Sequence, residues 1–196
     1  MEFELDGVTW SGPLADDPEL AGELPEALRA LLSQHNGFIL RGGALHVRGL
    51  VTSPPWHSLR GVWRGAGSLS SLFASVQAGD VPFAQDCVGD QFLLREGQVL
   101  RLEAETGEVY PIAVSLAEFL KAAAREPQDY LQTHPLEQFR EGGAELAPGH
   151  CLHADPPLCT VDAEQGVSLR DLPAAELLLI HAELARQLAD VPDVRR

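Results

Sequence analysis

The sequence predicts an α+β fold in which a central, mainly antiparallel sheet is flanked by helices. Two observations support this prediction. Short apolar segments separated by glycine turns fill the middle of the chain, which is typical of an antiparallel meander. Amphipathic helical segments lie on both sides of that region, and each needs an apolar surface to cover its apolar face.

The first predicted elements are a short strand within residues 3–10 and a helix over residues 24–35. Pro25 suits the first helical position, where its missing N–H costs nothing. Asn36-Gly37 then tolerates the left-handed backbone that often ends a helix. The apolar residues of this helix recur at helical spacing on one face: Leu24, Leu28, Leu31 and Leu32.

Strands dominate the middle of the chain. Residues 38–40 and 44–51 flank a glycine turn and are predicted to pair, and residues 56–74 favour a loop with one or two short helices. A meander starts at Val81, and two-residue glycine turns separate its later strands. These later strands are residues 91–95, 98–103 and 108–113. Pro82 lacks a backbone donor, which favours an edge position for its strand.

A capped helix follows the meander. Ser115 and Glu118 have the spacing of a capping box for a helix that ends at residue 126. Its predicted core stripe is Leu116, Phe119, Leu120 and Ala123. A second helical piece covers residues 128–140 and is interrupted at Pro135.

The C-terminal third continues with an irregular stretch rich in proline, histidine and cysteine. A last helix then runs from Pro173 to about Ala189. Its predicted core stripe is Leu177, Ile180, Leu184 and Leu188. Residues 191–196 are expected to fray.

Composition indicates an ordinary core and an acidic surface. Hydrophobic residues make up 45% of the 196 residues, which is typical of a globular protein and argues against disorder. The 29 acidic residues outnumber the 14 basic ones, for a formal net charge of −15. Such a surface repels nucleic acid and anionic lipid and suits a basic protein partner. The alternative is that the acidity serves solubility alone.

The sequence also predicts a cytoplasmic protein. The N-terminus lacks the apolar segment of a secretory signal, and no stretch approaches the roughly 20 apolar residues of a membrane span. The three cysteines are an odd, low number and are expected to be reduced thiols: Cys87, Cys151 and Cys159.

Three segments, taken in order, resemble the SUKH superfamily. Residues 24–37 (LPEALRALLSQHNG) resemble its proline-started opening helix, which ends in an Asn-Gly or Gly-Gly pair. Residues 81–92 (VPFAQDCVGDQF) resemble its segment of the form pFa-x-D-x-x-GD-x-f. Residues 112–120 (IAVSLAEFL) are similar to its closing helix, with Leu116 where an aromatic residue is common.

The resemblance implies an α+β fold and protein binding, and it implies no active site. The superfamily includes fungal cell-wall regulators of the Smi/Knr type. It also includes bacterial immunity proteins that neutralise toxins, often nucleases, by binding them. Because the similar segments end near residue 125, we expect a SUKH-like domain over residues 1–126. Residues 127–196 are then a helical C-terminal extension packed on the same body.

Four residues are candidates for partner contact. Asp86 and Asp90 lie in the segment between two predicted strands, where a structural role as acceptors of backbone N–H bonds is favoured over a role in binding. Gly89 can turn the chain tightly there. Trp56 and Trp63, like Trp10, could anchor an interface, although core packing is the commoner fate of tryptophan.

The residues His150, Cys151 and His153, with Asp155 and Cys159 nearby, could supply a nucleophile or hold zinc. Their spacing fits neither well, because zinc ligands usually form two separated pairs. A buried cysteine with solvated histidines is therefore favoured, and we predict no metal and no cofactor.

The predicted function is protein binding, in the form of an immunity protein that neutralises a basic toxin domain, possibly a nuclease. No enzymatic activity and no contact with nucleic acid or membrane are predicted. Two alternatives are kept. The first is a Smi/Knr-like regulatory scaffold. The second is a small hydrolase or metalloenzyme built on the segment from His150 to Cys159.

Overall fold

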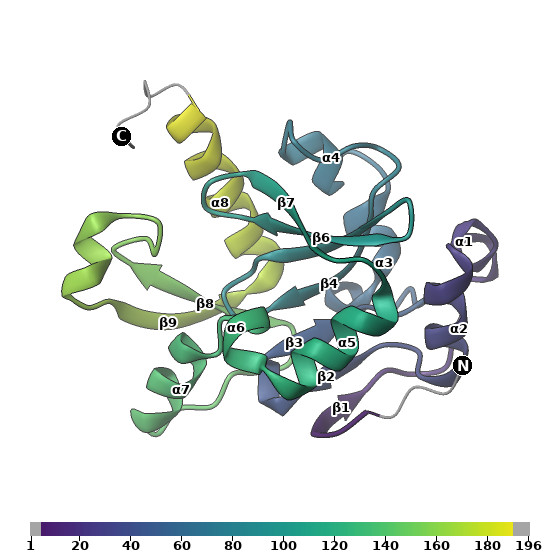
Figure 1. Cartoon of the computed structure of the whole chain (residues 1–196), viewed down its shortest axis with the longest axis horizontal. Helices are drawn as coiled ribbons and strands as arrows, with labels where there is room; N and C mark the ends of the chain where they lie inside the picture. The colour runs from purple at the N-terminus through teal and green to yellow at the C-terminus, as the bar shows by residue number, and fades with distance from the viewer. Residues whose placement is uncertain (1–4, 190–196) are drawn as a thin grey trace.

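A seven-stranded sheet with helices on both faces forms the centre of the computed structural model, which describes residues 5–189 (Figure 1). Neighbouring strands follow the order of the chain, and every pair is antiparallel. The strands are β1 (Val8–Ser11), β2 (Phe38–Leu40), β3 (Leu45–Val47), β4 (Val81–Asp86), β5 (Gln91–Arg95), β6 (Gln98–Glu103) and β7 (Glu108–Ala113). The predicted α+β class is confirmed.

The helices surround this sheet. They are α1 (Pro18–Glu23), α2 (Glu26–Gln34), α3 (Leu59–Trp63), α4 (Leu69–Leu72), α5 (Leu116–Arg125), α6 (Pro127–Leu131), α7 (His134–Glu141) and α8 (Ala174–Ala189). Three short 3₁₀ turns lie in the connections between other elements: η1 (Arg41–Gly43), η2 (Pro55–His57) and η3 (Val161–Gln165). No helix within residues 5–189 is both long enough and apolar enough to cross a membrane.

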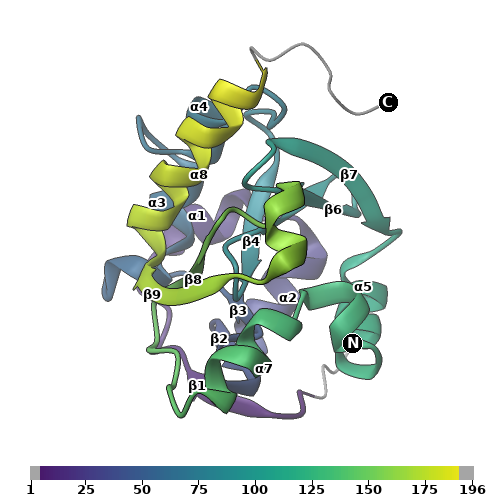
Figure 2. The ribbon, with the colours of Figure 1, turned by 90° about the vertical axis from the view of Figure 1, so that its left-hand side faces the viewer.

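The two faces of the sheet have different coverings. Side chains alternate between faces along a strand, so Phe92 and Leu93 of β5 point in opposite directions. Phe92 packs against Phe119 of α5, with ring centroids 4.7 Å apart. Leu93 belongs to a second apolar cluster, to which α4 and α8 contribute. Figure 2 accordingly shows α5 and α8 on opposite sides of the sheet.

One row of side chains crosses the first four strands on the side of α8. Trp10 pairs with Ile39, and Ile39 pairs in turn with His46 of β3. His46 pairs with Gln85 of β4. The residues on either side of His46 are buried and apolar and belong to the main core on the opposite face, so His46 is a polar residue between two apolar neighbours in β3.

The N-terminal elements follow the predictions in part. Helix α1 was not predicted, and Leu24, predicted to lie in the following helix, is the C-cap residue of α1. Pro25 precedes α2 as its cap residue and is not its first helical residue. The edge position predicted for Pro82 was wrong, because β4 lies between β3 and β5. A register shift between Pro82 and Ala84 accommodates the missing donor. The strand predicted over residues 3–10 appears as Val8–Ser11, and residues 3 and 4 lie outside the described residues.

The middle of the chain and α5 match their predictions. Ser115 caps α5 by accepting a hydrogen bond from the Glu118 backbone N–H at 3.2 Å. After α5 the chain turns at Gln132, which has a φ of 46°, and not at Pro135. Pro135 instead lies in the first turn of α7, where proline is tolerated.

The stretch expected to be irregular contains a hairpin of β8 (His150–Asp155) and β9 (Ser168–Pro173). Sequence analysis missed it because its strands are joined by a long loop that contains η3, with no short turn to mark the pairing. The hairpin attaches to the main sheet through the Leu152 N–H, which donates to the Cys87 carbonyl at 2.7 Å.

The predicted core stripe of α8 was wrong in part. Leu177 is buried, but Ile180 and Leu188 are each 37% exposed and Leu184 is half-buried. The residues of α8 that face the protein are Leu177, Leu178, His181, Ala182 and Ala185. Since α8 carries apolar residues on several sides, spacing alone does not decide which side packs against the sheet. The tail, residues 191–196, lies outside the described residues.

Residues after 127 share the core of the preceding domain. Leu131, Leu136 and Leu152 belong to the same buried cluster as the residues of α2 and α5. Glu105, which follows β6, accepts hydrogen bonds from the backbone N–H groups of Leu158 and Cys159 at 3.1 and 2.7 Å. Removal of the extension would therefore uncover both apolar and polar groups.

We expect limited proteolysis of the full chain to give no early, stable fragment that ends near residue 126. The physical reason is that a cut near residue 126 releases a fragment only if the buried contacts of Leu136 and Leu152 open first. Mass spectrometry of a protease time course measures this. Rapid release of a stable fragment of residues 1–126 would instead show that the extension is a separate, loosely attached unit.

Candidate functional site

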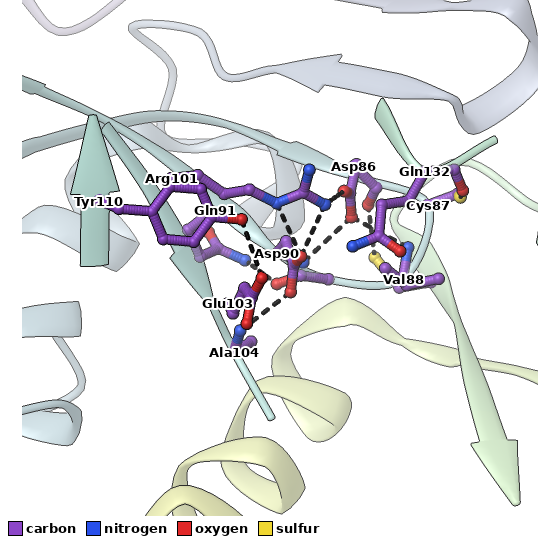
Figure 3. A network of polar contacts seen from close by, with 12 residues as sticks. Asp86, Cys87, Val88, Asp90, Gln91, Arg101, Glu103, Ala104, Tyr110 and Gln132 are labelled. Carbon is purple, nitrogen blue, oxygen red and sulfur yellow. Dashed lines mark hydrogen bonds and ion pairs between the residues drawn. The ribbon is translucent and has the colours of Figure 1, made fainter. Parts of the chain in front are cut away.

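Three buried charged side chains hold the turn between β4 and β5 (Figure 3). Asp86 accepts hydrogen bonds from the backbone N–H groups of Val88 and Asp90 at 3.1 and 3.0 Å. The Nη2 atom of Arg101 lies 2.8 Å from Asp86 Oδ2 and 2.7 Å from Asp90 Oδ2. Gly89 adopts a φ of 91°, which lets the chain turn tightly between the two carboxylates.

Burial governs the electrostatics of this turn. It raises the pKa of Asp86 well above its usual value, and the nearby charge of Asp90 adds to the effect, while Arg101 opposes both. Burial raises the pKa of Asp90 in the same way. For Arg101 burial acts to lower the pKa, but attraction to the two carboxylates outweighs it and raises the pKa. One guanidinium thus balances two carboxylates inside the fold.

The structure does not gather the four predicted contact residues on one exposed surface. Asp86 and Asp90 are buried and engaged in the turn, as the structural interpretation expected. Trp63 is 7% exposed and belongs to the main core. Trp56 packs against Trp10, with centroids 4.9 Å apart, and against the backbone of Gly149. Contact of these residues with a partner stays a prediction, and their packing favours structural roles.

Successive side chains of β8 point to opposite faces, so the strand does not bring its histidine and cysteine side chains together. His150 Nδ1 lies 2.8 Å from Asp171 Oδ2, whereas Cys151 is buried and accepts a hydrogen bond from Gln85 Nε2 at 3.1 Å. Burial raises the pKa of Cys151 to about 12, so this thiol is not a ready nucleophile. Within residues 5–189, no three His, Cys, Asp or Glu side chains are arranged to hold a metal ion.

The candidate binding site that sequence reasoning missed is a groove beside the outer face of α8. Its volume is about 540 Å³. His153 and Pro157 line it together with the solvent-facing apolar side of the helix, where Leu179 is 59% exposed. The residues that line it are Glu105, His153, Pro157, Glu176, Leu179, Ile180, His181, Glu183, Leu184 and Gln187.

The groove combines apolar surface with an acidic border. Glu176 and Glu183 are exposed on α8. Hydrogen bonds from Arg186 lower the pKa of Glu183 to about 2, so that carboxylate is ionised at neutral pH. Arg186 forms an ion pair with Glu183 at 2.6 Å, which leaves Glu176 as an exposed carboxylate of the groove outside any ion pair among residues 5–189. An exposed apolar face beside such a carboxylate is suited to bind a partner that has apolar side chains and a basic border.

One signal in the sequence points to this site. Leu177, Leu178, Leu179 and Ile180 are four consecutive apolar residues in a helix. Four consecutive positions span more than one side of a helix, so a single buried face cannot cover all of them. The excess indicates an apolar face that is left for another contact.

Replacing Arg101 by methionine is expected to destabilise the protein by about 3–5 kcal/mol, because two buried carboxylates lose their counter-charge. Urea unfolding measures this loss. The double variant R101M/D86N should be more stable than R101M, since it removes one of the two uncompensated charges. Equal stability of the two variants would show that the carboxylates do not repel each other in the fold.

The loss of stability that R101M causes relative to the parent protein is also expected to become smaller as the pH falls from about 7 to about 5. Loss of Arg101 raises the folded-state pKa values of Asp86 and Asp90 further above their unfolded values. The folded variant then takes up protons before the unfolded chain does, so its stability relative to the parent rises on acidification. Unfolding curves at the two pH values test this, and a constant deficit would contradict it.

Comparison with known families is in line with the fold and with the sequence resemblance. The family model described as the SMI1 / KNR4 family (SUKH-1) matches residues 19–122, just over half of the chain. The matched range contains the turn of Asp86, Asp90 and Arg101 and ends within α5, so β8, β9 and α8 lie beyond it. A search of curated proteins found no match. The match confirms the predicted resemblance, and the chain belongs to the SMI1/KNR4 family, SUKH-1.

Proposed function

We propose that this protein is a cytoplasmic immunity protein that binds a basic toxin domain through the groove beside α8 and covers the toxin's functional surface. The observation that carries the proposal is the exposed apolar face of α8 with its acidic border. The family membership supports a binding role, because SUKH proteins include immunity proteins of this kind. No chemical step is assigned to this chain.

The apolar residues of the groove supply the affinity. Leu179 and Ile180 are exposed, and full burial of such a side chain contributes about 1.5–3 kcal/mol. A few central anchors carry most of the binding energy in protein interfaces. Contacts around these two residues therefore set the dissociation rate of the complex.

The acidic residues supply the association rate and the choice of partner. The net charge of −15 attracts a basic protein from a distance, and the carboxylate of Glu176, which forms no ion pair among residues 5–189, orients it at the groove. A nuclease must be basic where it holds phosphates. An acidic binding face can therefore occupy the same site and exclude the substrate.

A second candidate function is a Smi/Knr-like regulator that binds several partners weakly. The family membership favours it equally, and the acidity would then serve solubility alone. The two candidates differ in partner number and in salt dependence.

The first test is a pull-down with the product of the adjacent gene, followed by protection of cells against that product. We expect a single stable complex and protection. Substitution of Ile180 by serine should weaken binding by about tenfold or more, whereas Leu14→Ala, at a 92% exposed leucine outside the groove, should have no effect. Absence of both binding and protection would favour the regulator.

The second test follows association rates across a salt series. Rates should fall steeply as salt rises, because the Debye length shrinks from about 10 Å at 0.1 M to about 3 Å at 1 M. E176Q should slow association more than the matched variant E26Q, which removes the same charge on α2, away from the groove. Slow association that is indifferent to salt would rule out electrostatic steering.

A further inference from the structure

A mostly buried carboxylate lines the groove beside α8 without a cation to balance its charge. Glu105 lies just after β6 and lines the groove together with His153 and His181. Its side chain is 12% exposed, so it is largely withdrawn from water but still reaches the groove. No lysine or arginine within residues 5–189 forms an ion pair with it.

The buried aspartates of the described chain are different, because each of them forms an ion pair with an arginine. They are Asp17, Asp80, Asp86 and Asp90. Glu105 is held instead by two uncharged donors, the backbone N–H groups of Leu158 and Cys159. These bonds fix the position of the carboxylate but bring no full positive charge to it. The fold therefore orients this carboxylate and leaves its charge unbalanced, which is costly in a partly buried place.

The neighbouring imidazole supplies no charge at neutral pH. His181 Nε2 lies 3.9 Å from Glu105 Oε1, which is too far for a hydrogen bond. Burial lowers the pKa of His181 to about 4, and the nearby His153 adds to the effect. Arg170 lies opposite His153 in the β8–β9 register, but it does not line the groove. The groove is lined by three glutamates and, within residues 5–189, by no lysine or arginine.

The surroundings of Glu105 suit a flat cation on an apolar stem. Pro157, Ile180 and Leu184 line the groove with it, and Ile180 is 37% exposed. The methylene stem of an arginine can pack on such side chains while its head group pairs with a carboxylate. A guanidinium is also more weakly hydrated than an ammonium group, so it is the better cation for a partly buried ion pair. Each oxygen of Glu105 accepts one backbone N–H and has a lone pair left for a further donor.

We propose that an arginine side chain of the toxin domain inserts into the groove and pairs with Glu105. This inference rests on the proposed function and adds to it the residue type that the partner presents. The guanidinium supplies the missing counter-charge, and its stem packs against Ile180 and Pro157. A withdrawn ion pair of this kind acts mainly on the dissociation rate, whereas the exposed Glu176 acts on the association rate. Glu105 and the arginine are then a central pair of the interface.

Benzamidine tests the site in the full chain without the toxin, because it joins a flat amidinium cation to an apolar ring. A titration followed by NMR should show binding in the millimolar range, with shifts at the methyl groups of Ile180 and Leu184. Benzamide has nearly the same shape and no charge, and it should bind about tenfold more weakly or worse. Equal binding of the two compounds, or no binding of either, would overturn the cation site.

Variants assign the cation to one carboxylate. E105Q, shown to be folded by circular dichroism, should weaken benzamidine binding about tenfold. E26Q on α2 should leave binding unchanged, and E176Q at the groove should change it less than E105Q does. A loss in E176Q as large as that in E105Q would contradict the assignment. If E105Q does not fold, E176Q and E183Q decide the assignment: retained binding in both supports Glu105, and a tenfold loss in either rules it out.

The toxin complex separates this inference from the proposed function. E105Q should raise the dissociation rate about tenfold with little change in the association rate, which is the reverse of the effect expected for E176Q. A complex that I180S weakens and that folded E105Q leaves unchanged would rule out the arginine anchor and leave the immunity function standing. Binding of benzamidine at Glu105 without any toxin complex would support the cation site and overturn the immunity function.

Discussion

The ion pairs of Arg101 with Asp86 and Asp90 hold together the part of the fold on which the C-terminal extension depends. They fix the turn between β4 and β5 against β6, and the extension attaches to that same turn. Leu152 of β8 bonds to the carbonyl of Cys87 within the turn. The glycine of the turn also faces α8, since a Cβ on Gly89 would lie 3.5 Å from His181 and Leu177. A buried charge cluster thus positions both the hairpin and the last helix.

The extension covers the second face of the sheet, the face opposite α5. This arrangement leaves a groove beside α8 and a cavity beside His46. Along β5 and β6 that face is apolar, and the inner side of α8 covers it closely, which leaves the outer side of the helix exposed. Across β1 to β4 the same face carries a polar row with His46 and Gln85, and the covering segment meets it with a cavity between them. Two parts of the extension therefore line the two hollows: α8 lines the apolar surface groove, and residues 145–150 line the cavity.

Buried and exposed charges have different roles in this molecule. The buried charges of Asp86, Asp90 and Arg101 are paired with one another and serve the fold, because an unpaired charge in the interior is costly. The buried Arg48 has no carboxylate partner and is instead held by neutral acceptors, the Pro82 carbonyl and the side chains of Gln85 and Gln91. Of the exposed carboxylates on α8, Glu183 is paired with Arg186, whereas Glu176 forms no ion pair among residues 5–189 and adds negative charge to the groove. The net charge of −15 bears on association with partners and has no bearing on the fold itself.

The amino-acid sequence by itself determined the fold class, the four strands from Val81 to Ala113, the capped helix α5 and the family, because turns, caps and alternation are local signals. It indicated that Asp86 and Asp90 serve a turn, but Arg101 as their partner emerged only from strand register. Tertiary structure alone decided the β8–β9 pairing, the side of α8 that faces solvent and the cavity beside His46. Each of these depends on contacts between residues far apart in the chain. In a helix with apolar residues on several sides, the sequence does not show which side will be buried.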